Sequence, residues 1–447
     1  MVLHQINKKI TTGLFVLFVL TNNLHAHMHQ MADTLVCVFM AGINNLAGFA
    51  PRNIKQMAAI GSNENLHIAV HLDIKLNGNK KVSRRYYIEP NKINHVNAHD
   101  PASQQMDSGN PETAITFFNW CVDNCPAKHY VFIFWNHGYG IIDPQNGYAI
   151  DTSKLFHLNP SIHKLELDRS VDFLELIEKP LIDPKGICWD DITGNYLTNQ
   201  KLEYVLEKMT EKIGRKLDIV VFDACLMSMI EIADILKKYA HYMVGSQEVV
   251  LGPGYNYKEL LSPYLQTTPL DMESFAKHIV TSYKKTYSNI TNDYTQSALC
   301  LDELFALENN INQVSTLLLE CLSLQYQQSV KNVINICKSP SYCTHFDLTS
   351  YIDLQHFYKN LLNNLNRMNL KDENRKYQLL NELQTNLQTG LDIINRIVIE
   401  NVAGPNLSQA SGIAIYFPDR KIHTSYKKTN FSKENAWGTL LTRYILS

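Results

Sequence analysis

The chain of 447 residues lacks several motifs by which common enzyme classes are recognised. It contains no His-Glu-x-x-His pair, so a zinc peptidase of that type is not indicated. It contains no Gly-x-Ser-x-Gly, which removes the usual serine hydrolase elbow. The sequence Gly138-Tyr139-Gly140 lacks the third glycine of a dinucleotide-binding turn. Any chemistry must therefore come from other residues.

The chain also has a net charge close to zero. The chain carries 41 Lys and Arg residues against 43 Asp and Glu residues, for a formal net charge of -2, and 45% of its residues are hydrophobic. This composition fits a soluble globular protein and gives no electrostatic reason to expect nucleic acid or an anionic membrane as a partner. At this length we expect one large domain with an addition, or two domains.

Long apolar runs are missing after the N-terminus. There, Lys8 and Lys9 precede the run GLFVLFVL at residues 13–20, and Leu24-His25-Ala26 follows it. The run is too short to cross a bilayer, so residues 1–26 are predicted to be a cleaved signal peptide, with an uncleaved anchor as the alternative. We expect a secreted or periplasmic protein with no stable membrane insertion after signal removal.

The nine cysteines form an odd count. In an exported protein they allow up to four disulfides and one free thiol. Two pairs are close enough in sequence to form local disulfides, Cys121 with Cys125 and Cys337 with Cys343. Cys37 and Cys300 each lie in an apolar run, which is typical of a buried thiol. The pairing itself is left open.

Alternating strand and helix patterns predict an α/β fold with a largely parallel sheet. Expected strands cover residues 34–40, 66–74, 131–135, 217–223 and 242–244, and expected helices cover 46–60, 114–121, 197–213 and 226–239. We assign one domain to residues 31–300. A mainly helical region, 301–447, is expected to return a strand to the core. Residues 138–186 show no regular pattern and are predicted to be an irregular insertion.

Two of these strands end in a reactive residue. The run VFIFW leads to Asn136-His137-Gly138, and the run LDIVVF leads to Asp223-Ala224-Cys225. The C-terminal edge of a parallel sheet is where sites form, so the imidazole and the thiol are expected to meet there. A histidine beside a cysteine indicates a thiol nucleophile, as in cysteine peptidases. The alternative is an inert buried cysteine and a chance His-Gly pair.

The same residues could stabilise an oxyanion. Gly138 has no Cβ, so its N–H can approach a substrate closely. Cys225 is expected at a strand-to-helix turn, where its own N–H points outward and the following helix N-terminus favours a thiolate.

The sequence resembles the clostripain-like cysteine peptidases, in the wider group with caspases, gingipains and legumain. The matching segments are residues 35–46, Asn136-His137-Gly138, residues 222–227, residues 246–248 with 252–255, and residues 413–418. The resemblance implies a caspase-like three-layer α/β/α sandwich. It also implies a catalytic dyad of His137 and Cys225, with oxyanion N–H groups from Gly138 and Cys225.

The resemblance further implies cleavage after Arg or Lys, with Asp223 at the position that receives the basic side chain. Residues two apart on a strand share a face, so Asp223 can lie beside Cys225. A cap on the following helix is the alternative role for Asp223, and Glu248 is a second pocket candidate. Members of the family are activated by self-cleavage between the histidine and the cysteine. Here Lys154 and Arg169 are the favoured positions.

Some points stay open. The chemistry needs no cofactor, but the family sometimes needs calcium, for which Asp190-Asp191 could supply ligands. Ile43 and Tyr255-Asn256-Tyr257 depart from the family pattern near the expected pocket. The expected partners are protein or peptide substrates. The alternatives are a catalytically silent binding protein on the same fold, or the same dyad with transpeptidation or non-basic specificity.

Overall fold

The computed structural model describes residues 28–76, 80–142, 155–169, 187–266, 270–323, 327–368 and 373–446. The predicted signal peptide, Lys154 and much of the predicted insertion lie outside these residues. Among the described residues, no helix has both the length and the hydropathy needed to cross a membrane.

A nine-stranded sheet forms the centre of the molecule, in the order β12-β10-β9-β8-β5-β1-β2-β3-β4. Its parallel middle consists of β9 (Ala240–Gly245), β8 (Leu217–Asp223), β5 (Ala127–Trp135), β1 (Ala32–Gly42) and β2 (Leu66–Leu76). Both edges are antiparallel, with β10 (Thr295–Cys300) and β12 (Val398–Ala403) on one side and β3 (Lys80–Glu89) and β4 (Lys92–His95) on the other. The expected α/β fold is confirmed.

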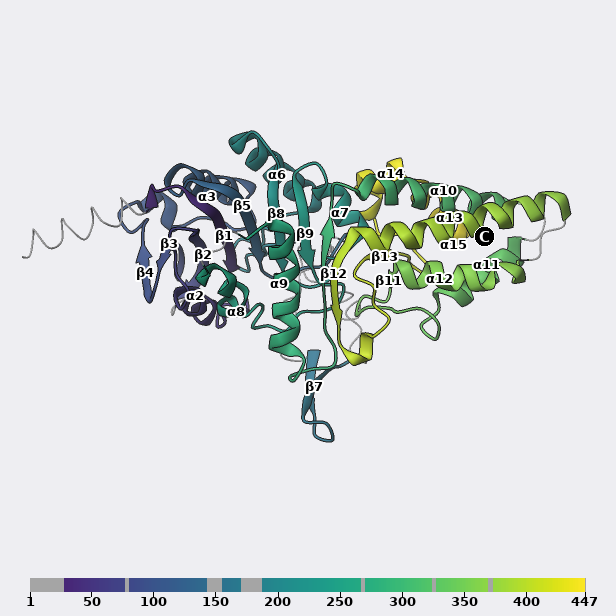
Figure 1. The fold of residues 1–447 in the computed structure, drawn as a ribbon, viewed down its shortest axis with the longest axis horizontal. Coiled ribbons are helices and arrows are strands. Elements are labelled where there is room, and N and C mark those ends of the chain that lie inside the picture. The colour runs from purple at the N-terminus through teal and green to yellow at the C-terminus, as the bar shows by residue number, and fades with distance from the viewer. Residues whose placement is uncertain are drawn as a thin grey trace, which may run out of the picture.

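Helices cover both faces of this sheet, which explains why its central strands are largely apolar. One face carries α3 (Pro111–Asn124), α6 (Asn199–Ile213) and α7 (Ile230–Leu236), and the other carries α2 (Ala50–Ala58), α8 (Tyr257–Leu260) and α9 (Met272–Tyr287) (Figure 1). Every residue of β8 is buried. Phe134 of β5 stacks on Phe222 of β8 with ring centroids 5.7 Å apart. The result is the three-layer sandwich that the sequence predicts.

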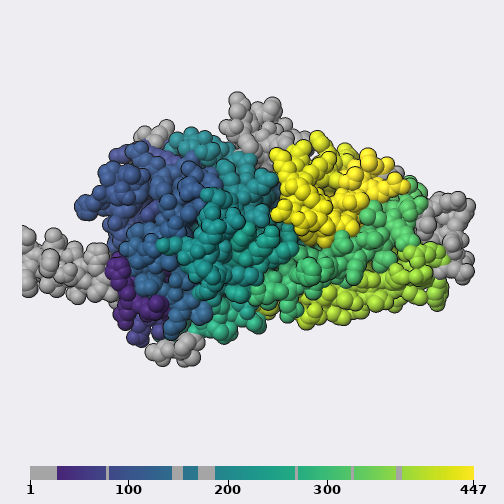
Figure 2. All heavy atoms as spheres, turned by 90° about the horizontal axis from the view of Figure 1, so that it is seen from above, coloured from purple at the N-terminus to yellow at the C-terminus, as the bar shows by residue number. Residues whose placement is uncertain are grey.

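The C-terminal region is mainly helical and extends the molecule at one end (Figure 1). Its helices are α10 (Leu304–Ser323), α11 (Gln327–Lys338), α12 (Leu354–Asn364), α13 (Glu373–Ile397), α14 (Asn430–Glu434) and α15 (Ala436–Leu446). Figure 2 shows the last residues of the chain, in yellow, lying over this helical region. The strand that joins the main sheet from here is β12. Residues 413–418, one of the segments that resemble the family, include β13 (Ala414–Tyr416), which pairs with β11 (Tyr351–Asp353).

The structure differs from the sequence predictions in two places. Part of the predicted irregular insertion is a hairpin of β6 (Phe156–Asn159) and β7 (Lys164–Leu167), which projects from the body (Figure 1). The helix expected to begin at Leu226 begins only at Ile230. Leu226 has a φ of 61°, outside the right-handed helical region, and the N–H of Ser228 donates to the carbonyl of Ser246.

The nine cysteines all fall within the described residues, and each is a free thiol. Cys121 and Cys125 are buried near the end of α3, and Cys37 is buried in β1. Neither local pair forms a disulfide, because these side chains pack as small apolar groups in the interior.

Candidate active site

His137 and Cys225 come together at the C-terminal edge of the sheet. Strands β5 and β8 are neighbours, with Trp135 opposite Asp223, and each reactive residue follows its strand by two positions. The N–H of Asn136 donates to the carbonyl of Asp223 at 3.2 Å, which ties the two strand ends together. His137, Asp223 and Cys225 line one cavity of about 20 Å³. That volume holds about one water molecule, so the site is closed in this structure.

Asn45 orients the imidazole of His137. Its Oδ1 lies 2.7 Å from Nε2 of His137. An amide oxygen accepts hydrogen bonds, so Nε2 carries the proton and Nδ1 is the nitrogen that can act as a base. The sequence analysis gave Asn45 no role. Its position just after β1, at the same edge of the sheet as His137, was the signal that could have found it.

Cys225 is buried, with its sulfur facing a backbone donor. The N–H of Val250 lies 3.3 Å from Sγ. Burial raises the pKa of the thiol to about 12, the Val250 N–H opposes that rise, and the carboxylates of Asp347, Glu248 and Asp223 add to it. The expected contribution of a helix N-terminus is wrong, because α7 begins five positions after Cys225. In this closed form the sulfur is a neutral thiol at neutral pH.

Gly138 lies against the backbone of Cys225. A Cβ at this position would be 2.4 Å from the carbonyl oxygen of Cys225. The position therefore requires glycine, because any side chain would separate the two strand ends. The predicted oxyanion N–H groups of Gly138 and Cys225 thus come from two backbone segments in direct contact.

Asp223 is buried beside Cys225 and faces two hydrogen-bond donors. Both carboxylate oxygens lie 3.2 Å from the N–H of Tyr255, and the hydroxyl of Tyr257 donates to Oδ2 at 2.9 Å. Burial raises the pKa of Asp223 to about 7, and these two donors oppose the rise. Its carboxylate makes these bonds and not the alternative helix cap.

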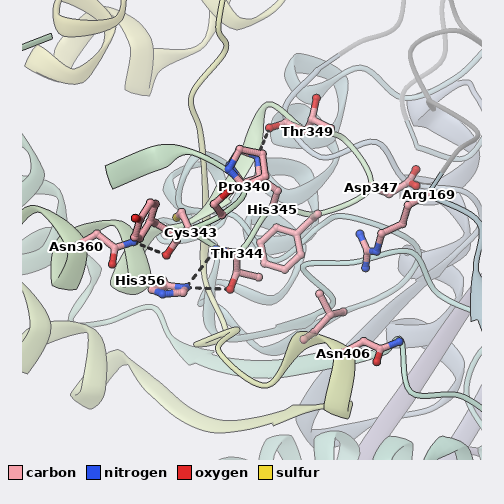
Figure 3. A pocket seen from close by; sticks show the side chains of 14 residues that line it. Arg169, Pro340, Cys343, Thr344, His345, Asp347, Thr349, His356, Asn360 and Asn406 are labelled. Carbon is pink, nitrogen blue, oxygen red and sulfur yellow. Dashed lines mark hydrogen bonds between the residues drawn. The ribbon is translucent and has the colours of Figure 1, made fainter. Parts of the chain in front are cut away.

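Glu248 and Arg169, which the sequence analysis placed in different roles, form an ion pair. Nη2 of Arg169 lies 3.0 Å from Oε2 of Glu248 and 3.4 Å from Oδ1 of Asp293. Glu248 is fully buried, whereas the side chain of Arg169 is 42% exposed. Figure 3 shows Arg169 beside Asp347 on one wall of a larger cavity, whose volume is about 740 Å³.

Asp190 and Asp191 do not suit calcium. The ammonium of Lys81 binds Asp190, and the indole N–H of Trp189 binds Asp191. Two N–H groups of the following turn also donate to Asp190, from Ile192 and Thr193. An ammonium group on the carboxylate excludes a second cation there, and the described ranges contain no group of three His, Cys, Asp or Glu residues that could hold a metal.

Sequence comparison identifies a curated relative of this chain. The curated protein clostripain from Hathewaya histolytica is 26% identical over 242 residues, which cover 48% of this chain and 39% of that protein. The chain therefore matches about two fifths of the length of that relative.

Two solved structures share the fold. A secreted C11 cysteine protease from Bacteroides thetaiotaomicron, bound to an irreversible peptide inhibitor, has a TM-score of 0.55 at 17% identity, covering 92% of this chain and 99% of that one. An inactive zymogen C11 protease from Parabacteroides distasonis has a TM-score of 0.57 at 17% identity, covering 90% of this chain and 98% of that one.

The model of the Clostripain family matches residues 38–164 and 175–443, most of the chain. The chain therefore belongs to the clostripain family.

Proposed function

We propose that this protein is a cysteine endopeptidase that acts through His137 and Cys225. The observation that carries the proposal is the shared cavity, in which the imidazole, the thiol and the Asp223 carboxylate lie at the end of two adjacent parallel strands. Family membership supports it, as does the contact between Nε2 of His137 and Oδ1 of Asn45, which orients the imidazole.

In the proposed reaction, His137 takes the thiol proton of Cys225 and the sulfur attacks the scissile carbonyl. The N–H groups of Gly138 and Cys225 stabilise the negative charge on the tetrahedral oxygen. His137 then protonates the leaving amine, the C–N bond breaks, and a thioester to Cys225 remains. Water, deprotonated by His137, attacks the thioester carbon, the C–S bond breaks to release the carboxylic acid product, and the proton returns from His137 to the sulfur.

We propose that Asp223 selects Arg or Lys at the position before the cleaved bond. A carboxylate pairs with guanidinium or ammonium groups. A Cβ added at Gly254 would lie 2.5 Å from the carboxylate oxygens of Asp223. Only the backbone of a glycine therefore fits against Asp223 at this position. A cavity of about 20 Å³ does not admit such a side chain. The loop of residues 250–257 must therefore move before substrate binds.

A mixed peptide library tests the reaction and the specificity together. The purified protein should cleave peptides after Arg and Lys, and a thiol-directed peptidyl probe should label Cys225. Cys225→Ala is the matched control. A folded protein that neither cleaves nor labels would be a binding protein on this fold. Cleavage after neutral residues or peptide ligation would replace the proposed specificity or reaction. Assays with and without calcium test whether the metal acts elsewhere in the chain.

We also propose that the protein is exported and activated by self-cleavage at Lys154 or Arg169. Lys154 lies outside the described residues. Cleavage after Arg169 requires its guanidinium to leave Glu248 and Asp293, because the proposed reaction pairs the side chain before the cleaved bond with Asp223. N-terminal sequencing of the active protein would identify the cut, and also any signal removal. A single intact chain with full activity would refute the requirement, and fragments in Cys225→Ala would point to another protease.

A further inference from the structure

Glu248 is a buried junction of four groups, three at its carboxylate and one at its backbone carbonyl. Its carboxylate oxygens accept hydrogen bonds from the guanidinium of Arg169 at 3.0 Å, the N–H of Val249 at 2.9 Å and the N–H of Asp347 at 2.9 Å. Its own backbone carbonyl accepts the N–H of Leu226 at 3.3 Å. A buried carboxylate is stable only when it is paired and hydrogen-bonded. Arg169 supplies the formal positive charge among these partners.

This junction lies next to the nucleophile along two paths of the backbone. Leu226, which donates to the Glu248 carbonyl, directly follows Cys225. Val250, whose N–H faces the sulfur at 3.3 Å, is two positions after Glu248. The segment 248–250 therefore connects the carboxylate to the donor that contacts Sγ. A shift at Glu248 would reach the thiol through both segments.

Arg169 is held in place by the hairpin that precedes it. The ammonium of Lys164 donates to the carbonyl of Ser288 at 2.8 Å and to Oδ1 of Asn292 at 2.9 Å. The N–H of Leu167 donates to Asp293 at 3.2 Å. Hairpin β6–β7 thus runs along residues 288–293 and delivers the guanidinium to its two carboxylates.

The guanidinium of Arg169 offsets part of the negative charge near the Cys225 sulfur. The ionisable groups that face Cys225 are His137, Tyr139, Asp223, Glu248, Tyr283 and Asp347. Burial lowers the pKa of Arg169, but the Glu248 and Asp293 carboxylates outweigh this effect and keep its pKa above the ordinary value. Arg169 therefore stays charged and partly neutralises Glu248, one of the carboxylates near Cys225.

We propose that Arg169 is a positioning residue for Cys225: by neutralising Glu248 and Asp293, it holds the 248–250 turn against the sulfur and lowers the negative field at the thiolate. This role rests on the proposed function and is separate from self-cleavage. Burial raises the pKa of Glu248 and Arg169 opposes that rise, so without the cation Glu248 ionises at higher pH, and its charge there opposes ionisation of the thiol. A rise of about one unit in the pKa of the Cys225 thiol lowers the thiolate fraction about tenfold at a given pH. We therefore expect Cys225 to react at a pH about one unit higher than in the wild type.

The test follows iodoacetamide modification of Cys225 by mass spectrometry from pH 5 to 10. Arg169→Ala should move the pH–rate profile up by about one unit and slow the reaction about tenfold on its rising limb. Arg169→Lys keeps a cation and should stay close to wild type. The double variant Arg169→Ala/Glu248→Gln removes the unpaired charge and should regain most of the rate. Lys164→Ala, which loosens the same hairpin but keeps the Arg169 cation, should shift the profile less than Arg169→Ala does.

The cavity of about 740 Å³ beside Arg169 allows chemical rescue. Guanidinium ion at millimolar concentration should enter it, bind Glu248 and Asp293, and restore the rate in Arg169→Ala without affecting wild type. Guanidinium cannot recreate a cleavage site, so rescue distinguishes positioning from processing.

Four results would overturn the inference: an unchanged profile in Arg169→Ala, an equal loss in Lys164→Ala, no rescue of a folded Arg169→Ala, or a folded Arg169→Lys that behaves like Ala. If Arg169→Ala does not fold, the Lys variant still decides. A wild type whose Cys225 never reacts would instead refute the proposed function.

Discussion

Replacing Asp223 by asparagine should separate stability from specificity. In the folded protein the pKa of this carboxyl is raised to about 7 by burial, whereas an unfolded chain has the ordinary value near 4. Between these values the native state binds a proton that the unfolded state has lost. Stability contributed by the neutral form is therefore present at low pH and disappears as the pH rises through 7.

The size of the effect follows from the same values. Two pH units separate pH 5 from the folded pKa of about 7, and each is worth about 1.36 kcal/mol, so wild type should lose roughly 2–3 kcal/mol of unfolding free energy between pH 5 and pH 8 through this group alone. Asparagine does not titrate. Its amide can accept from the Tyr255 N–H and donate to the Tyr257 hydroxyl, so the packing is kept.

Urea unfolding of the two proteins at pH 5 and pH 8, both carrying Cys225→Ala to prevent self-digestion, measures this difference. The Asp223→Asn protein should gain about 2–3 kcal/mol relative to its parent on going from pH 5 to pH 8. With the thiol intact, the same substitution should lower kcat/KM for Arg and Lys substrates several tens-fold, since a lost charge partner costs about 2–5 kcal/mol. Parallel pH dependence would refute the buried, proton-binding carboxyl. Equal loss on basic and neutral substrates would make Asp223 structural.

Three further outcomes are expected. Cys225→Ala should abolish hydrolysis without lowering the melting temperature, and His137→Ala should lose nearly as much because the dyad acts as a unit; near-normal turnover in either would contradict the assignment. Asn45→Ala should lower kcat roughly tenfold or more with little change in KM, since the base is no longer oriented, whereas Asn45→Asp keeps an acceptor and should retain more activity. In thermal unfolding, Gly254→Ala should destabilise the protein by more than the roughly 1–2 kcal/mol that a left-handed φ costs, because the added Cβ also meets the carboxylate oxygens of Asp223. Gly214 has a φ of 70° and nothing within 4 Å of an added Cβ, so Gly214→Ala should show the cost of the left-handed backbone alone.

The sequence predicted the main sheet because its central strands carry a local signal. Strands β5 and β8 are covered on both faces, so each reads as an uninterrupted apolar run, and parallel pairing then places their C-terminal ends at one edge. That argument is sufficient to bring His137 and Cys225 together. Helix α6 also has a local start signal, since the side chain of Thr198 accepts from the N–H of Lys201 within the same turn.

Patterns of this kind failed where a local preference was overruled by distant contacts. Residues 226–229 have helical composition, yet Leu226 bonds to Glu248 and Met229 bridges Ala414, so α7 starts late. The hairpin at 156–167 has weak periodicity of its own and is fixed by a bridge from Leu165 to Thr291.

The sequence by itself determined the α/β class, the edge of the sheet where chemistry is possible, and the two residues that meet there. This was possible because short apolar runs indicate buried strands, and buried strands indicate a parallel sheet. Only the tertiary structure decided how those residues are supported. The Arg169–Glu248 pair joins positions 79 apart, and the bond between His137 and Asn45 joins positions 92 apart. Such contacts depend on how whole elements pack, and no local pattern specifies them. The environment of Asp223 is of the same kind: a carboxylate that the sequence places beside the nucleophile is buried under Tyr255 and Tyr257, and that burial sets its charge.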